Sequence, residues 1–192
     1  MYRRVHMAQM IYKFTAEEYQ LMGKAGIFHP EARVELINGE IIIMSPIGLK
    51  HSVTINRLSR YLFDRINTNQ GIISVQNSFR IPDYSEPQPD IVILRPREDF
   101  YAHKFPLPED ILLLIEVADS SLKYDQTTKL SLYAEHHIPE YWIANLERDI
   151  LEIYRQPQNQ SYLKQTLIDS AVIPFAPIAF PEIKMTLKDI YG

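Results

Sequence analysis

The sequence predicts an α/β (α+β) fold: a central mixed β-sheet with an N-terminal hairpin and flanking helices. Three observations favour this class. Residues 34–44 have a hairpin pattern, residues 49–67 have the apolar spacing of a helix, and residues 111–115 form an entirely apolar strand that precedes a second helical pattern. The order of these elements favours one domain over residues 1–192, with a core at about 33–155, a helical extension at 1–32 and a strand and loop extension at 156–192.

The N-terminal elements have clear boundary signals. Thr15 and Glu18 have the spacing of a capping box, which predicts a short helix from about Ala16. Strands are expected at 34–37 and 40–44. The intervening Asn-Gly pair is favoured in a two-residue type I′ turn, in which both residues need positive φ.

The central segments alternate between helical and strand patterns. Apolar residues at helical spacing within 49–67 predict the next helix; they are Ile55, Leu58, Leu62 and Ile66. Strands are expected within 71–82, at 91–94 and 111–115, and on both sides of residues 147–149. A helix is expected from about Tyr124 to His136. The proline-rich tail is expected to wrap the sheet edge as strands and irregular chain.

Composition restricts the classes of function. The absence of cysteine excludes disulfides and thiolate metal sites, and no apolar run approaches the roughly 20 residues needed to span a bilayer. The basic start "MYRRVHMAQMIYKF" lacks the apolar core of a signal peptide, so we expect a cytoplasmic protein with no membrane contact. The net charge of −4 argues against indiscriminate polyanion binding but leaves room for a local basic groove.

Two carboxylates are expected to meet at one edge of the sheet. Asp90 begins the apolar run 91–94, and Glu116 follows the apolar run 111–115. If these strands are antiparallel neighbours, the start of one lies beside the end of the other. Adjacent carboxylates repel each other unless a cation lies between them, and such oxygen ligands suit Mg²⁺. The following helix adds Asp125, Lys129 and Tyr133 on one face.

A purely structural interpretation of these residues is also open. Glu116 is then a charged strand end in solvent, Asp90 a turn residue after proline, and Lys129 a solvated helix residue paired with Asp125. The spacing alone does not decide between this interpretation and a metal site.

Four motifs in order resemble one known family. The segments "ELINGE", "QPDIVIL", "LLLIEVADSS" and "YDQTTKLSLYAEHHIPEYWI" are similar to the Uma-two-type family of restriction endonucleases, within the PD-(D/E)xK nuclease superfamily. The similarity runs from about Arg33 to Tyr154. It implies the restriction-endonuclease-like fold and hydrolysis of phosphodiester bonds.

The resemblance also implies roles for individual residues. Asp90 matches the PD element and Glu116 the acidic residue of the ExK element, so both would be metal ligands. Position 118 is alanine where the superfamily has lysine, and Lys129 on the following helix would take that role. Glu35 matches the upstream acidic ligand, with Glu40 as the alternative.

Several further residues have open alternatives. For Gln88 the two alternatives are a contact with the metal or its water and a structural role in the turn. Asp125 is expected to contact the metal ligands without binding the metal itself. His51 contacts phosphate or a metal ligand, or caps its helix. His136 and His137 point in different directions on a helix and are taken as surface or interface residues. The aromatic residues Tyr124, Tyr133, Tyr141 and Trp142 are taken as core residues rather than base-stacking groups.

The leading hypothesis is a metal-dependent endonuclease acting on DNA as a homodimer. Asp90, Glu116 and Glu35 would hold Mg²⁺ or Mn²⁺, and Lys129 would assist catalysis. The residues expected to contact nucleic acid are Lys50, His51, Arg57 and Arg60. One alternative is a catalytically weak or inactive module that binds nucleic acid or protein. A hydrolase for a small phosphorylated substrate ranks last, because no Walker-type phosphate loop is present.

Overall fold

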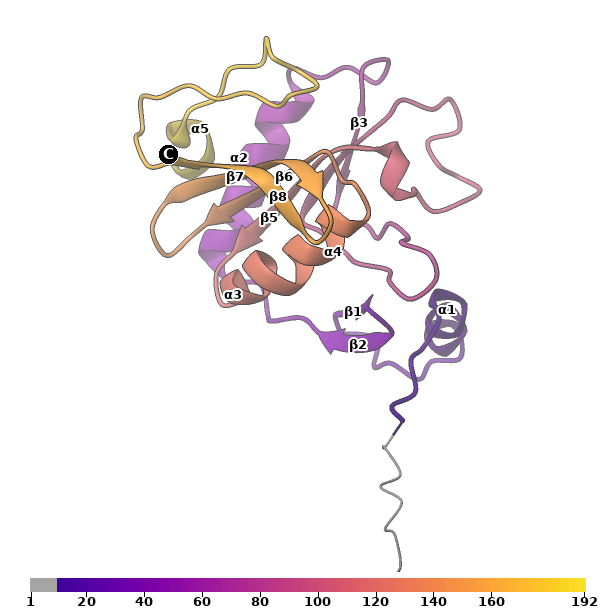
Figure 1. Ribbon diagram of the computed structural model, residues 1–192. Coiled ribbons are helices and arrows are strands. Elements are labelled where there is room, and N and C mark those ends of the chain that lie inside the picture. The colour runs from indigo at the N-terminus through magenta and orange to yellow at the C-terminus, as the bar shows by residue number, and fades with distance from the viewer. Residues whose placement is uncertain (1–9) are drawn as a thin grey trace, which may run out of the picture.

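The computed structural model describes residues 10–192 and confirms the predicted fold class (Figure 1). The first half of the chain contains α1 (Ala16–Lys24), β1 (Val34–Ile37), β2 (Glu40–Ile43), α2 (Leu49–Phe63), β3 (Ile72–Val75) and β4 (Ile91–Leu94). The second half contains η1 (Pro108–Asp110), β5 (Ile111–Ala118), α3 (Leu122–Tyr124), η2 (Asp125–Lys129), α4 (Leu130–Glu135), β6 (Glu140–Asn145), β7 (Ile150–Gln158), β8 (Ser161–Ile168) and α5 (Leu187–Tyr191). The expectation about a signal peptide concerns the chain start, most of which lies outside the described residues.

Six strands form the main sheet in the order β3-β4-β5-β6-β7-β8. Every neighbouring pair is antiparallel except β5 and β6, which are parallel. A parallel pair cannot be joined by a tight turn and needs a crossover. The segment α3-η2-α4 provides this crossover, which places the predicted helix of the second half directly against one face of the sheet.

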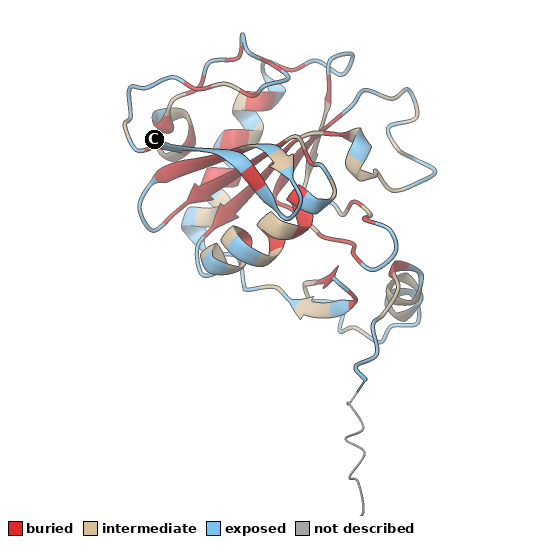
Figure 2. Cartoon of the chain, in the orientation of Figure 1, coloured by how far each residue is buried: buried red, intermediate tan, exposed pale blue. Residues whose placement is uncertain are grey.

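Alternation along the strands gives the sheet two apolar faces. One face packs on α2 and on the C-terminal segment, through residues such as Leu58, Trp142 and Met185. The other packs on α4, through residues such as Leu114 and Leu132. Because successive side chains of a strand point to opposite faces, Glu116 points with Leu114 toward α4. Figure 2 shows that the buried residues concentrate in these central strands.

The N-terminal hairpin pairs in the predicted register. Ile37 lies opposite Glu40, and the connecting Asn38 and Gly39 both have positive φ, 51° and 77°. The hairpin forms its own two-stranded sheet beside the main one (Figure 1). Leu36 exchanges two backbone hydrogen bonds with Glu86, so β1 is tied to the segment that leads into β4. This pairing brings the hairpin to the start of β4, where Asp90 lies.

The tail contains a helix that the sequence did not predict. After β8 the chain runs irregularly and then forms α5, which packs on α2. The helix has a capping box between Thr186 and Asp189. Strand β5 also continues through Ala118, so Glu116 lies inside the strand and not at its end.

No helix within residues 10–192 has the length and apolar character needed to cross a bilayer.

Candidate active site

Asp90 is buried at the start of β4 and is surrounded by hydrogen-bond donors. Its Oδ2 accepts from the Val117 N–H at 2.9 Å and lies 3.1 Å from Nε2 of His51, and its Oδ1 accepts from Gln76 at 3.1 Å. Burial by itself raises the pKa of Asp90, but His51, Val117 and Gln76 outweigh burial and hold the pKa below its ordinary value. Asp90 is therefore an ionised carboxylate at neutral pH.

Glu116 is buried on the neighbouring strand. Its Oε1 accepts from Lys129 Nζ at 3.0 Å and from the Tyr133 hydroxyl at 3.0 Å. Its Oε2 is 3.4 Å from the backbone nitrogen of Asp90, so the antiparallel register of β4 and β5 brings the two carboxylates together. Burial raises the pKa of Glu116 well above its ordinary value; Lys129 opposes this shift, and nearby carboxylates add to it.

Lys129 reaches the carboxylates from a π-helical turn. Its ammonium lies 3.0 Å from Glu116 and 3.1 Å from Glu35, and its side chain is only 4% exposed. The backbone N–H of Leu130 bonds to the Asp125 carbonyl five residues back, the spacing of a π-turn. Burial by itself lowers the pKa of Lys129, but the surrounding carboxylates outweigh burial and raise it, so this lysine is positively charged.

Besides the Lys129 contact, the π-turn η2 is attached to the sheet by three hydrogen bonds. The Tyr141 hydroxyl donates to the Asp125 carbonyl at 3.2 Å, and Gln126 donates to both oxygens of the buried Glu152 at 2.8 and 3.0 Å. These contacts come from β6 and β7. They fix the turn that carries Lys129 relative to the strand that carries Glu116.

The hairpin supplies the third carboxylate. Glu35 is buried and accepts from the backbone N–H of Gln88 at 3.1 Å in addition to its ion pair with Lys129. Glu40, the alternative considered from the sequence, is exposed and pairs with Lys13 at 2.6 Å. Of the two glutamates, only Glu35 lines the cavity described below.

His51 lies in the first turn of α2 beside Asp90. Gly48 is the N-cap of this helix, so His51 does not cap it. The histidine side chain is 14% exposed, and its Nδ1 is buried without a hydrogen-bond partner among residues 10–192. The imidazole therefore has one nitrogen at Asp90 and one nitrogen free for another group.

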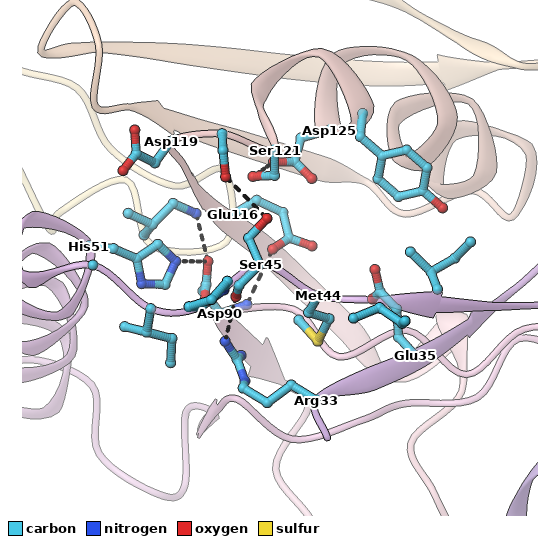
Figure 3. A pocket seen from close by; sticks show the side chains of 18 of the residues that line it. Arg33, Glu35, Met44, Ser45, His51, Asp90, Glu116, Asp119, Ser121 and Asp125 are labelled. Atoms are coloured by element: carbon cyan, nitrogen blue, oxygen red, sulfur yellow. Dashed lines mark hydrogen bonds and ion pairs between the residues drawn. The ribbon is translucent and has the colours of Figure 1, made fainter. Parts of the chain in front are cut away.

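One cavity of about 250 Å³ is lined by Glu35, His51, Asp90, Glu116 and Lys129 (Figure 3). The loop between β2 and α2 and the loop after β5 form its rim, where the hydroxyls of Ser45 and Ser120 are 3.1 Å apart. Arg33 reaches toward the rim and donates to the Ser45 carbonyl at 3.4 Å (Figure 3). It forms no ion pair with a described carboxylate, so its charge is available to an anion in the cavity.

The cavity contains more buried negative than positive charge. Its buried carboxylates are Glu35, Asp90, Glu116 and Asp125, whereas Lys129 is its one buried lysine or arginine in the part of the chain that the structure describes. Burying unpaired charge is costly, so this surplus is relieved either by protonation, which the raised pKa values of Glu116 and Asp125 favour, or by an added cation.

The donor chemistry fits a hard divalent ion. Carboxylate oxygens are the ligands that Mg²⁺ prefers, and Mg²⁺ usually takes one or two carboxylates and retains several waters. Within residues 10–192 no three His, Asp or Glu side chains already converge as a closed metal site. A site built on Asp90 and Glu116 plus water agrees with both observations.

Asp125 predicts a pH dependence of stability. Burial raises its pKa to about 6, against the opposing effects of Lys129 and the Ser121 hydroxyl, which donates at 2.6 Å. A carboxyl with a raised folded-state pKa stabilises the fold below pH 4 and loses that contribution as the pH rises through 6. We therefore expect the free energy of unfolding, measured in EDTA, to fall between pH 4 and pH 7 by about 1–3 kcal/mol less in Asp125→Asn than in the wild type. Urea unfolding at pH 4 and pH 7 measures it, and equal declines in both proteins would contradict the assignment.

Other residues expected in the site lie in different places. Gln88 donates to the Gln76 carbonyl at 2.7 Å and so braces the loop beside Asp90. Lys50 pairs with Asp149 at 2.7 Å, and its ammonium also donates to the Leu146 carbonyl. Two arginines line a separate groove along α2 and α5, and one of them pairs with Asp64; they are Arg57 and Arg60.

Tyr133 is a fully buried core residue, as expected, and its hydroxyl in addition donates to Glu116. Tyr124 lines the cavity, whereas His136 and His137 do not.

The sequence interpretation missed three contributors: Arg33, Gln76 and Ser121. Arg33 had a detectable signal, because it directly precedes the strand that carries Glu35. Gln76 and Ser121 had none, since their roles depend on the pairing of β3 with β4 and on the bend after β5.

Comparisons with known proteins agree with the fold and the motifs. The model of the Uma2 family, described as "Putative restriction endonuclease", matches residues 16–188. A crystal structure from Anabaena variabilis, described as a putative nuclease belonging to DUF820, superposes with a TM-score of 0.71 at 18% identity, over 93% of this chain and 97% of that one. No curated protein matches the chain. Because the family model covers most of the sequence, the chain belongs to the Uma2 family of restriction-endonuclease-like proteins.

Proposed function

We propose that the chain is a metal-dependent endonuclease that hydrolyses phosphodiester bonds of DNA. The observation that carries this proposal is the position of Lys129. Its ammonium is 3.0 Å from Glu116, in the cavity that Asp90 also lines. Position 118, where the superfamily has lysine, is alanine in this chain. Lys129, from the helical segment after β5, instead places an ammonium near the acidic pair Asp90 and Glu116. Family membership supports a nuclease.

In this proposal Asp90 and Glu116 hold Mg²⁺ or Mn²⁺, with Glu35 nearby. When bound, the ion supplies Lewis-acid stabilisation of the scissile phosphate and lowers the pKa of the attacking water. Asp90 suits this role because His51, Gln76 and Val117 keep it ionised and fixed in orientation. Gln88 and Asp125 support these ligands indirectly. The backbone N–H of Gln88 donates to Glu35, and the negative charge of Asp125 favours the protonated form of Lys129.

Lys129 acts as a fixed positive charge. Its raised pKa keeps it protonated at working pH, so it does not act as a general base. An ammonium held beside the carboxylates orients the attacking water and stabilises negative charge that develops on the phosphate. Glu35 and Tyr133 hold this geometry, since one contacts Lys129 and the other contacts Glu116.

Arg33 and His51 are the side chains that contact the scissile phosphate in this proposal. Both line the cavity, and each has donor capacity that no described residue uses. Lys50, Arg57 and Arg60 also lie on α2 and would contact flanking phosphates. Cutting both strands of a duplex would require two such sites, and for this reason we extend the proposal to a homodimer.

Cleavage of plasmid and single-stranded DNA in Mg²⁺ or Mn²⁺ tests the proposal. We expect wild-type protein to cut at least one substrate and to stop in EDTA. Arg33→Ala should raise KM about 10-fold or more, because it removes a charge-assisted contact to phosphate. Arg148→Ala is the matched control, since Arg148 is an exposed arginine that does not line the cavity. Equal KM values for the two variants would contradict the role of Arg33.

A non-catalytic binding module is the second candidate. The observation that favours it is that Lys129 already bridges Glu35 and Glu116, so part of the buried charge is neutralised without a metal. A thermal shift with Mn²⁺ separates the two candidates, because a ligand that binds only the folded protein raises its melting temperature. An unchanged melting temperature would favour the binding module.

A further inference from the structure

A second groove, of about 560 Å³, lies between the edge strand β3 and the loop that joins β4 to η1. This loop projects from the β3 side of the sheet (Figure 1). The groove residues that matter here are Ser74, Asn77, Phe100, His103, Lys104 and Phe105. None of them takes part in the carboxylate site described above.

The loop is built to hold one aromatic ring in solvent. Phe100 and Tyr101 both have positive φ, 48° and 60°, which costs energy in residues that carry a Cβ. Arg97 makes two bonds to Asp99, at 2.9 and 2.7 Å, and Asp99 accepts from the Tyr101 N–H at 3.3 Å. These contacts hold the turn, and Phe100 remains 58% exposed.

The groove differs in charge from the rest of the chain. Its lining contains Lys104 and His103 and no carboxylate, although the whole chain has a net charge of −4. Side-chain amide and hydroxyl groups come from Asn77 and Ser74, which also bond to each other at 3.1 Å. An exposed ring, a nearby cation and hydrogen-bonding groups are the features that bind unpaired bases and their phosphates.

The groove is connected to the carboxylate site through β3 and β4. Leu94, which lines the groove, lies on the same strand face as Asp90, four residues away. At about 3.3 Å per residue this separation is about 13 Å, or about four nucleotides of a stacked strand. Gln76, next to Asn77, also donates to Asp90. Because Val92 and Leu94 are buried, the accessible link between the two places is the β3 segment, where Ser74 and Asn77 line the groove and Gln76 reaches Asp90.

We propose that this groove binds an unpaired segment of nucleic acid, with a base stacked on Phe100 and the backbone near Lys104. The proposal deepens the proposed function and rests on it for the fate of the bound strand: it makes single-stranded or locally opened nucleic acid the preferred substrate. Stacking on one ring is sequence-tolerant, so the groove selects unpaired bases rather than a particular sequence.

The test is fluorescence anisotropy with a labelled 12-nucleotide oligo-dT and a duplex of the same length, in EDTA so that no metal-dependent cleavage occurs. Wild-type protein should bind the single strand more tightly than the duplex. Phe100→Ala should weaken that binding about 5- to 100-fold, Phe100→Tyr should retain it, and Lys104→Ala should flatten its salt dependence. The matched control is Phe63→Ala, since Phe63 is equally exposed, at 56%, on α2.

Absence of single-strand binding by the wild type, or equal binding by Phe100→Ala and the wild type, would overturn the proposal. Failure of the proposed nuclease function would give a different result. Single-strand binding would still depend on Phe100, but no metal-dependent cleavage would occur. Conversely, Phe100→Ala could bind and cleave single strands as well as the wild type does. That result would support the nuclease function and show that the groove does not bind the substrate.

Discussion

Replacing Lys129 with alanine is expected to lower the rate of DNA cleavage by about 10²- to 10³-fold, the range seen when one preorganised transition-state contact is removed. The ammonium is 4% exposed and lies between Glu116 and Glu35, so water does not substitute for it. The loss should fall on kcat rather than on KM, because the charge acts on the reacting group. Steady-state kinetics on a single-stranded and a duplex substrate measure both constants.

The same substitution should destabilise the fold by about 3–5 kcal/mol, since it leaves buried carboxylates without their cation. Adding Glu116→Gln removes one of those charges and should restore much of the stability but none of the activity. This double variant tests whether the uncompensated charge of Glu116 causes the loss of stability. Lys123→Ala is the control, because Lys123 is an exposed lysine on the same crossover. Restored stability with restored cleavage would contradict a catalytic role for Lys129.

Replacing Asp90 with asparagine is expected to abolish both metal binding and cleavage. The asparagine carbonyl can still accept from Val117, so the strand ends keep their contact, but the negative charge that attracts a divalent ion is gone. In wild-type protein, Mn²⁺ at 100 times its dissociation constant should stabilise the fold by about 2.7 kcal/mol, which raises the melting temperature by about 5–10 °C. Asp90→Asn should show no such rise.

The control for this comparison is Asp64→Asn. Asp64 is a partly exposed aspartate that pairs with Arg60 on α2, so its loss should leave the Mn²⁺ response unchanged. A full Mn²⁺ response in Asp90→Asn would mean that the ion binds elsewhere in the chain.

The parts of the fold that depend on local chemistry were predictable from the sequence. Asn38 and Gly39 set the hairpin register because they accept positive φ, and Thr15 marks the start of α1. The meeting of Asp90 with Glu116 followed from two apolar runs and one assumption, that their strands are antiparallel neighbours. The register of β4 and β5 confirms that assumption.

The parts that depend on tertiary packing were not predictable. The π-turn at 125–129 has the composition of an ordinary helix, and its register is held by contacts from β6 and β7. The contact of His51 with Asp90 spans 39 residues of sequence. Helix α5 is too short for a periodic pattern; the Thr186–Asp189 capping box was its one signal.

The central claim is that Asp90 and Glu116 hold a divalent ion beside Lys129. The measurement that tests it most directly is anomalous diffraction from crystals soaked in Mn²⁺. We predict one anomalous peak between the two carboxylates, in the cavity rimmed by Ser45 and Ser120, and no peak there in crystals of Asp90→Asn. A wild-type map without a peak at these carboxylates, at Mn²⁺ concentrations that support cleavage, would contradict the claim.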